Sequence, residues 1–390
     1  MRSVFSEGCR VPIKMWVTDI EESALSQAVN LANLPFVFKH VALMPDCHSG
    51  YGMPIGGVIA TNGVVIPNAV GVDIGCGMCA IKTSLTGIDT QTIKKIMSGI
   101  RELVPLGFDH HEKKQEESLM PSTENIPEHG IVLRQYIAAL KQIGTLGGGN
   151  HFIEIQKGSD NHIWVMIHSG SRNIGLKVAN HYNSLAKSLN SRWHSVVDKK
   201  HDLAFLPIET QEAKNYFAEM QYCVEFAFAN RLLMMERIKS VFSTIVGESF
   251  SELEFINIAH NYAAWESHFD HNVIVHRKGA TRAREGEIGI IPGSQGTKSY
   301  IVCGKGNPES FTSCSHGAGR ALGRKQAQRE LDLEAEIAKL DSQGIVHSIR
   351  HVKDLDEASG AYKNINIVME NQKDLVDVLV ELSPLAVIKG

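Results

Sequence analysis

The 390-residue sequence contains no apolar run long enough to cross a bilayer, and its first residues lack the apolar core of a signal peptide. Its seven cysteines are an odd number and lack the regular spacing of a disulfide framework. These absences are typical of proteins from a reducing compartment. We therefore expect a cytoplasmic protein with no membrane partner.

The sequence also has no large excess of charge of one sign. Its formal net charge is −4, with 21% charged and 43% hydrophobic residues, which is the composition of an ordinary globular protein. A binding site for a polyanion would therefore have to be a local basic patch. Two candidate patches are present: Arg277, Lys278, Arg282 and Arg284, and then Arg320, Arg324, Lys325 and Arg329.

Three familiar motifs of phosphate chemistry are missing as well. The sequence has no G-x-x-x-x-G-K-[S/T] loop, no Lys-x-Asp-Gly motif, and no histidine followed two residues later by Ser or Thr. P-loop nucleotidases, lysine-based nucleotidyltransferases and two-histidine phosphoesterases are therefore excluded as families for this chain.

Hydrophobic patterns predict a mixture of strands and helices. Apolar runs predict strands at 58–61, 152–155, 163–167, 255–258, 273–276 and 299–302. Helical patterns appear at 92–104, at about 210–245 and at about 319–340, and the first places Ile93, Ile96, Met97, Ile100 and Leu103 on one face. The elements do not alternate as in a doubly wound sheet, and no repeat or linker divides the chain. We therefore expect a single α+β domain over residues 1–390, with a β-sheet core, surrounding helices and a central cleft.

Five side chains of the metal-ligand type stand among glycines or beside an asparagine: Asp73, Cys76, His151, His168 and His260. A carboxylate, a thiolate and three imidazoles are the mixed donors that a divalent transition metal selects. Five donors exceed the needs of one tetrahedral ion, and a thiolate can bridge two ions. The pattern predicts two metal ions roughly 3.5–4 Å apart, suited to phosphoryl transfer. The alternative is a set of buried core side chains that bind nothing.

Other histidines lack this glycine setting. His110 and His111 lie in a polar stretch that predicts a loop, and the cluster of His268, His271 and His276 is not expected to bind a metal. In the motif Pro-Asp-Cys-His-Ser-Gly, Asp46 and His48 either approach the substrate or belong to a structural turn.

A third feature is His316, which is followed by Gly-Ala-Gly-Arg and then by the predicted helix at 319–340. Helix N-termini favour anions, and Arg320 and Arg324 would share one helix face from which both reach phosphate oxygens. A neutral imidazole at this position can bind a metal or attack phosphorus, and the pattern does not choose between the two roles. The loop Pro292–Gly296 with Ser299 is either a second phosphate cradle or an ordinary turn.

These motifs occur with several others in a fixed order along nearly the whole chain. They occupy residues 44–57, 70–78, 146–151, 167–172, 260–262, 276–281, 292–294, 316–320, 361–363 and 389–390. Together they resemble the RtcB family of GTP- and manganese-dependent RNA ligases. The resemblance implies an enzyme that joins an RNA 3′-phosphate or 2′,3′-cyclic phosphate end to a 5′-hydroxyl end, in tRNA splicing or RNA repair.

The resemblance also implies roles for particular residues. Asp73, Cys76 and His151 would bind one Mn²⁺, and Cys76 would bridge to a second ion held by His168 and His260. His316 would take GMP from GTP as guanylyl-histidine and pass it to the RNA, which gives an RNA-(3′)pp(5′)G end.

The resemblance further implies a guanylate site and contacts with the RNA. The guanylate site would comprise Asn150, His151, Phe152, Ile153, Glu154, His260, Asn261, Pro292, Gly293, Ser294, Gln295, Ser299, His316, Gly317, Ala318, Gly319 and Lys389. Glu154 would accept hydrogen bonds from guanine N1–H and N2–H, which adenine cannot offer. The candidates for RNA contacts are Asp46, Arg172, Lys278, Arg320 and Arg324.

Three positions depart from the family pattern. Gln295 stands where a methionine is expected in the nucleotide loop, Gly323 replaces a serine, and Ser359 replaces a proline. Two other enzymatic readings remain: a metal-dependent cyclic phosphodiesterase without ligation, and a specialised RNA-repair paralogue that needs a partner. The guanylate residues argue against a pure hydrolase, and the complete ligand set argues against a non-catalytic RNA-binding subunit. We expect a monomer, and an accessory factor stays open.

Overall fold

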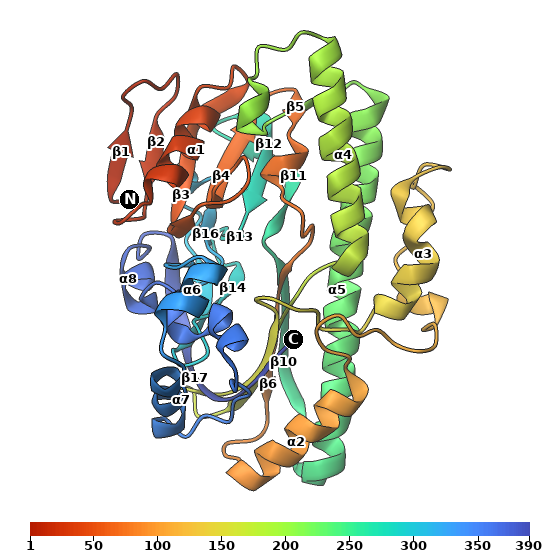
Figure 1. The fold of residues 1–390 in the computed structure, drawn as a ribbon, viewed down its shortest axis with the longest axis vertical. Helices are drawn as coiled ribbons and strands as arrows, with labels where there is room; N and C mark the ends of the chain where they lie inside the picture. The colour runs from red at the N-terminus through yellow and green to blue at the C-terminus, as the bar shows by residue number, and fades with distance from the viewer.

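Two β-sheets form the core of the computed structural model, which describes all of residues 1–390 (Figure 1). The first has six strands in the order β1-β2-β3-β4-β12-β11. Only β2 and β3 pair in parallel. Its strands are β1 (Ser3–Phe5), β2 (Ile13–Met15), β3 (Val37–His48), β4 (Ile55–Thr61), β12 (His271–Lys278) and β11 (Asn261–His268).

The second sheet has seven strands in the order β10-β6-β8-β7-β17-β15-β14, and all its pairs are antiparallel. Its strands are β10 (Glu252–Ala259), β6 (Gly77–Thr83), β8 (Ile163–Ser169), β7 (Phe152–Gly158), β17 (Val376–Lys389), β15 (Ser299–Gly304) and β14 (Ile288–Ile291). Two short sheets pair β13 (Ala280–Arg282) with β16 (Ser313–Ser315), and β5 (Val64–Val65) with β9 (Leu206–Pro207).

Helices cover the sheets on different sides of the molecule. The long helices α4 (Arg172–Arg192) and α5 (Gln211–Val246) run side by side, and α5 packs against β6, β8 and β10 (Figure 1). Around this pair lie α2 (Thr90–Leu103) on α5 and α3 (Ile131–Gln142) on α4. The remaining helices are α1 (Glu22–Ala32) on β3, and α6 (Arg324–Glu330), α7 (Leu333–Ser342) and α8 (Ile365–Glu370).

Local sequence explains where α2 and α5 begin. The Asp89 carboxylate accepts hydrogen bonds from two backbone N–H groups of the first turn of α2, and the Thr210 hydroxyl caps α5 in the same way. Four of the five apolar residues predicted on one face of α2 are buried against α5: Ile93, Ile96, Met97 and Ile100. Leu103 was placed wrongly on that face, because it is the last helical residue and is 42% exposed.

The α+β class is confirmed, and each predicted strand lies within an observed one. The predicted helix at 319–340 is wrong. His316 follows β16, Arg320 forms an isolated bridge with Tyr362, and α6 begins only at Arg324. The chain breaks again before α7, which is capped by the Asp332 carboxylate. Three glycines between 317 and 323 oppose a continuous helix, since glycine gives up the most backbone freedom on entering one.

None of the helices is both long enough and apolar enough to cross a membrane. All seven cysteines are free thiols.

Candidate metal and nucleotide site

The five predicted metal ligands meet at one edge of the seven-stranded sheet. Asp73 and Cys76 precede β6, His151 precedes β7, His168 lies near the end of β8, and His260 follows β10. Strand register brings these ends together, because Gly77 pairs with both Ser169 and Ala259, and Phe152 pairs with His168. Donors that are far apart in sequence thus converge because their strands are neighbours.

The donor atoms form two groups that share the Cys76 thiol. Cys76 Sγ lies 3.5 Å from His151 Nε2 and 3.3 Å from His168 Nε2. His151 Nε2 lies 3.2 Å from Asp73 Oδ2, and His168 Nε2 lies 3.4 Å from His260 Nε2. Within each group, Asp73–Cys76–His151 and Cys76–His168–His260, all donor atoms lie within 4.8 Å of one another. The donor atoms thus fall into the two groups that the family resemblance implies.

The orientation and ionisation of these side chains fit divalent metal ions. Nδ1 of His151 and of His168 each lies 3.1 Å from a backbone carbonyl, so each ring donates there and turns the lone pair of Nε2 toward the cluster. Burial lowers the pKa of both His168 and His260 and keeps the rings neutral, which is the metal-binding form. Burial and the neighbouring Asp73 raise the pKa of the Cys76 thiol, an effect that a bound cation would oppose.

Two polar side chains hold the ligand loops in place. The fully buried Arg231 of α5 donates to the carbonyls of Gly75 (3.0 Å) and Ser169 (2.9 Å). Asn261 donates to the Asp73 carbonyl at 3.0 Å, and its own side-chain oxygen accepts from the Gly279 N–H at 2.7 Å. Arg231 was missed from the sequence, although an arginine among the apolar residues of α5 was a usable signal.

His316 is held by a carboxylate rather than by a helix terminus. Its Nδ1 lies 2.6 Å from Asp46 Oδ2, and the backbone N–H groups of His316 and Gly317 donate to the same oxygen at 3.1 and 3.2 Å. The loop can close on Asp46 only because Gly319 has no side chain, since a Cβ there would lie 2.2 Å from the Asp46 carbonyl oxygen. The expected anion cradle is therefore filled by the protein's own carboxylate, and Nε2 of His316 stays free. The His316 ring lies 4.8 Å from the His260 ring, between centroids.

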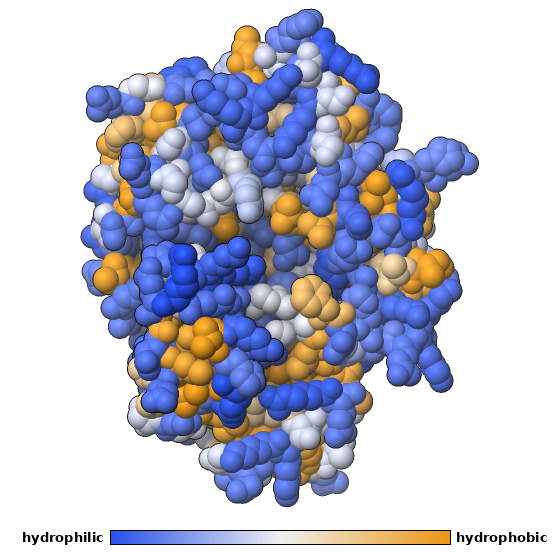
Figure 2. Space-filling model, viewed as in Figure 1, coloured by the Kyte–Doolittle hydropathy of each residue, from blue (hydrophilic) through white to orange (hydrophobic).

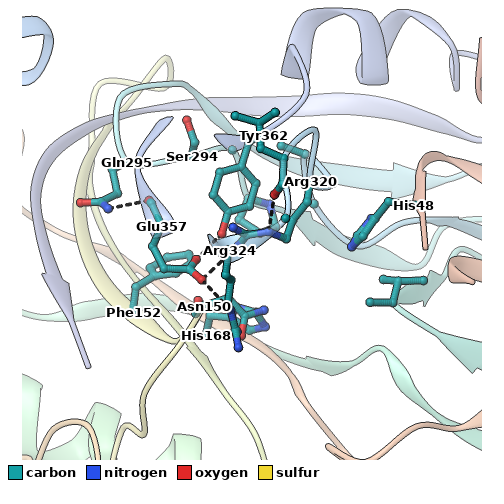
Figure 3. Close-up of a pocket in the computed structure, with 18 of the residues that line it drawn as sticks. His48, Asn150, Phe152, His168, Ser294, Gln295, Arg320, Arg324, Glu357 and Tyr362 are labelled. Carbon is teal, nitrogen blue, oxygen red and sulfur yellow. Dashed lines mark hydrogen bonds and ion pairs between the residues drawn. The ribbon is translucent and has the colours of Figure 1, made fainter. Parts of the chain in front are cut away.

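Beside this histidine opens a cavity of about 780 Å³ (Figure 3). The predicted nucleotide residues that line it are Asn150, Phe152, Glu154, Pro292, Gly293, Ser294, Gln295, His316, Gly317, Ala318, Gly319 and Lys389. Four others do not line it: Ile153, His151, His260 and Asn261. Ser299 also lies outside the lining but supports it, because its hydroxyl accepts from the Gly293 N–H at 3.1 Å.

The wall formed by β7 carries an unsatisfied acceptor. One carboxylate oxygen of Glu154 accepts from Gln156 at 3.0 Å, whereas Oε1 is buried without a hydrogen-bond partner. Burial raises the pKa of Glu154, and Lys389 opposes this rise. A buried acceptor without a donor is costly unless a ligand supplies one.

Glu357, which the sequence did not single out, is the hub of a charged network in the cavity wall (Figure 3). Its carboxylate lies 3.1 Å from Arg320, 3.5 Å from Arg324 and 3.6 Å from Lys389, and it accepts from the Tyr362 hydroxyl. Burial would raise the pKa of Glu357, but the surrounding cations and Tyr362 bring it below its ordinary value. Arg320 and Arg324 thus converge as expected, although they do not share a helix.

The other three candidates for RNA contacts have internal partners. Asp46 is fully buried beneath His316, and Lys278 is buried with its ammonium donating to the carbonyls of Tyr51 and Asn68. Arg172 donates to Thr145 Oγ1 at 3.2 Å and to the Gly107 carbonyl at 3.4 Å. We therefore do not propose Asp46 or Lys278 as contacts to RNA.

The three departures from the family pattern have ordinary structural partners. Gln295 donates to the Glu357 carbonyl at 2.7 Å, and Gly323 is the extended residue before α6. Ser359 donates to Glu336 at 3.0 Å and accepts from Lys339 at 2.8 Å. None of the three disturbs the donor cluster or His316.

Comparison with known proteins identifies the family of the chain. The family model described as "tRNA-splicing ligase RtcB" matches residues 27–134 and 122–390. The chain is 38% identical to the RNA-splicing ligase RtcB of Escherichia coli strain K12, over 97% of each chain. It is 30% identical to the tRNA-splicing ligase RtcB of Thermococcus kodakarensis, over 99% of this chain and 96% of that relative. The chain, with its five-donor cluster beside His316, belongs to the RtcB family.

Proposed function

We propose that this protein is an RNA ligase that uses GTP and two Mn²⁺ ions to join an RNA 3′-phosphate or 2′,3′-cyclic phosphate end to a 5′-hydroxyl end. The observation that carries the proposal is the position of His316. Its Nδ1 is fixed on Asp46 and its free Nε2 opens into a nucleotide-sized cavity beside five metal-type donors. Membership of a family whose relatives are named RNA-splicing ligases supports the choice of RNA as the substrate.

His316 acts as the nucleophile in the first step. Nε2 attacks the α-phosphorus of GTP, an N–P bond forms, and pyrophosphate leaves with the electrons of the broken P–O bond. The Nδ1–H stays donated to Asp46, whose carboxylate stabilises the positive charge that develops on the ring. Metal ions held by Asp73, Cys76, His151, His168 and His260 would supply positive charge to the phosphate oxygens.

The following steps transfer the guanylate to RNA. A cyclic end is first opened by water to a 3′-phosphate. An oxygen of that phosphate then attacks the guanylyl phosphorus, which breaks the N–P bond and returns His316 to its neutral form. Finally the 5′-hydroxyl attacks the activated 3′-phosphorus, and GMP leaves.

The choice of GTP over ATP rests on Glu154. Glu154 lines the cavity and its Oε1 has no hydrogen-bond partner, and guanine offers an N1–H and an N2–H donor, both of which adenine lacks. Lys389 lies with its Nζ 5.6 Å from the centre of the Phe152 ring, so a base that stacks on Phe152 also comes close to a cation.

Intact-mass spectrometry tests the proposal. After incubation with GTP and Mn²⁺, the protein should carry one GMP adduct, whereas ATP or the His316→Ala variant should give none. The ligation of RNA ends should be lost with the same substitution. Absence of the adduct from manganese-loaded protein would contradict the proposal, and a wild type that opens cyclic phosphates without an adduct and without joining ends would favour a hydrolase instead.

A further inference from the structure

We infer that two exposed aromatic rings, Phe108 beside the glycine loop of the metal donors and Tyr51 at the cavity, form base-stacking platforms that hold single-stranded RNA ends at the ligation site. The inference rests on the proposed function, since it concerns the RNA that the same site would join. Phe108 is 96% exposed and Tyr51 is 78% exposed, the first and third highest values among the large hydrophobic side chains. Single exposed apolar residues are common in proteins, so the position of these two rings has to carry the argument.

Phe108 lies at the tip of an anchored turn after α2. The Asp109 N–H donates to the Leu106 carbonyl at 3.0 Å, which closes the turn around Gly107 and Phe108. The Leu146 N–H donates to the Pro105 carbonyl at 3.0 Å, which ties the turn to the neighbouring segment. The backbone is therefore fixed while the ring points into solvent, which is the arrangement of a preformed platform.

The turn adjoins the glycine loop that leads to the metal donors. The Gly107 N–H donates to the Gly147 carbonyl at 3.2 Å, and Arg172 donates to the Gly107 carbonyl at 3.4 Å. Gly147 begins the loop that ends in Asn150 and His151. Phe108 is thus linked by direct contacts to the loop that delivers one of the predicted ligands.

The opposite side of this loop faces α6 across the cleft. A Cβ built on Gly149 would lie 2.8 Å from Nη2 of Arg324, so the arginine spans the opening between α6 and the glycine loop. Figure 2 shows the face in view hollowed near its centre, and the most hydrophilic side chains gather over α6 on its rim. Lys325 and Arg329 of α6 also line the cavity.

Tyr51 lies at the cavity, in the turn between β3 and β4. Its carbonyl accepts hydrogen bonds from Lys278 at 2.6 Å and from Asn68 at 3.2 Å, which pins the backbone. The side chain lines the same cavity as His48 and His316 but stays mostly open to solvent. A fixed backbone with an exposed ring therefore occurs both at the cavity and beside the glycine loop.

The combination of rings and cations identifies the ligand. Single-stranded nucleic acids bind where a basic groove follows the phosphates and aromatic rings stack on the bases. Here Arg324, Lys325 and Arg329 provide the cations, and Tyr51 and Phe108 provide the rings. A duplex keeps its bases stacked on one another, so the platforms favour unpaired RNA ends.

RNA affinity and guanylylation, measured separately, test the inference. With manganese-loaded protein and labelled single-stranded RNA bearing a 3′-phosphate, Phe108→Ala and Tyr51→Ala should each weaken binding roughly 5- to 100-fold. Phe108→Ala should leave the rate of GMP-adduct formation with GTP unchanged. The conservative variants Phe108→Trp and Tyr51→Phe, which keep an aromatic ring, should bind RNA as the wild type does. Trp265→Ala is the matched control, because this ring is 53% exposed but lines a different cavity, with Phe217 and Ile208.

Abasic RNA separates stacking from other effects. When the terminal nucleotides lack their bases, the wild type and the two alanine variants should bind with equal affinity. Neutral substitutions at Lys325 and Arg329 should instead reduce the slope of log affinity against log salt by about 0.7 each. Unchanged RNA affinity in both alanine variants, or a loss that persists on abasic RNA, would overturn the inference. If the wild type formed no GMP adduct, the proposed function would be contradicted. The RNA-binding measurements would still decide the inference about the two rings.

Discussion

Two groups of histidines lie along the neighbouring strands β11 and β12, and their ring nitrogens are used in different ways. His260 precedes β11 and belongs to the five-donor cluster, whose Nε2 atoms point at one another and at Cys76. At the other end of β11, His268 Nε2 lies 2.9 Å from the Glu266 carboxylate, and on β12 His276 Nε2 accepts from the Ile66 N–H at 3.0 Å. In the first group, the protein supplies no hydrogen-bond donor to the lone pairs of the ring nitrogens. In the second group, the ring nitrogens form hydrogen bonds within the fold.

The difference teaches that density of histidine in the sequence is a poor guide to a metal site. His268, His271 and His276 are close in sequence, yet no metal-competent group includes them. The donors of the first group come from segments between Asp73 and His260 and meet only because their strands are neighbours. A metal site is marked by metal-ligand atoms that come together from distant segments without hydrogen-bond partners, because burying a polar atom without a partner is costly.

The largest expected effect comes from removing the shared thiol. Cys76→Ala should reduce bound manganese from two ions to at most one and lower ligation by more than the roughly 10–100-fold typical of losing an outer hydrogen-bond partner. Elemental analysis and a ligation assay measure the two effects. Cys79→Ala is the matched control, since Cys79 is buried on β6, just after Cys76, but lies outside the cluster. If the two variants bound equal amounts of manganese, the proposed difference between the two histidine groups would be contradicted.

The next effect concerns the Asp46–His316 pair. Asp46→Asn should slow formation of the GMP adduct about 10²–10⁴-fold, because the amide cannot stabilise the charged ring and can select the wrong tautomer. Manganese content should not change. Asp341→Asn provides a control at an exposed pair, in which His347 Nε2 lies 3.2 Å from the carboxylate. A rate like that of the wild type in Asp46→Asn would show that His316 does not depend on this contact.

In the second histidine group the expected effect is on stability rather than on activity. Glu266→Ala removes the partner of the fully buried Arg277 and should lower the free energy of unfolding by about 3–5 kcal/mol. Denaturant unfolding measures the change, and metal content should stay at the wild-type value. Loss of manganese in a folded Glu266→Ala protein would mean that the second group contributes to the metal site.

The same ion pair predicts a dependence of stability on pH. Burial would raise the pKa of Glu266, but Arg277 and His268 lower it from 4.5 to about 2. A lowered pKa in the folded state means that the contribution is complete above about pH 4.5 and is lost as the pH falls toward 2. Glu266→Gln should therefore flatten the unfolding curve in this interval when compared with the wild type. An unchanged profile would show that the carboxylate is not ionised in the fold.

The smallest effect is expected at His271, which is exposed and bonds only to the Phe269 carbonyl, at 2.8 Å. His271→Ala should change the free energy of unfolding by less than about 0.5 kcal/mol and leave manganese content and ligation unchanged. Thermal unfolding and elemental analysis check this prediction. A clear loss of bound metal would contradict the division between the two groups.

Sequence patterns predicted the parts of the site that depend on local context. The glycines around Asp73, Cys76 and His151 and the period of α2 are local signals, and the structure agrees with both. The helix expected at 319–340 failed because its charged residues resemble a helix surface, whereas the glycines before Arg324 oppose one.

Contacts between distant segments were beyond these patterns. Asp46 was expected near the substrate, but its bond to His316 joins residues 270 positions apart. Glu357 brings Lys389 together with Arg320 and Arg324, and no local spacing connects Glu357 or Lys389 with the two arginines. Such pairs arise from the packing of the sheets and become visible only in the fold.

The most direct test is anomalous diffraction at the manganese absorption edge, from crystals grown with Mn²⁺. We predict two peaks about 3.5–4 Å apart. One should lie among Asp73, Cys76 and His151, the other among Cys76, His168 and His260, and no peak should lie near His268. Manganese bound at His268, or an empty five-donor cluster in crystals that hold manganese elsewhere, would contradict the account.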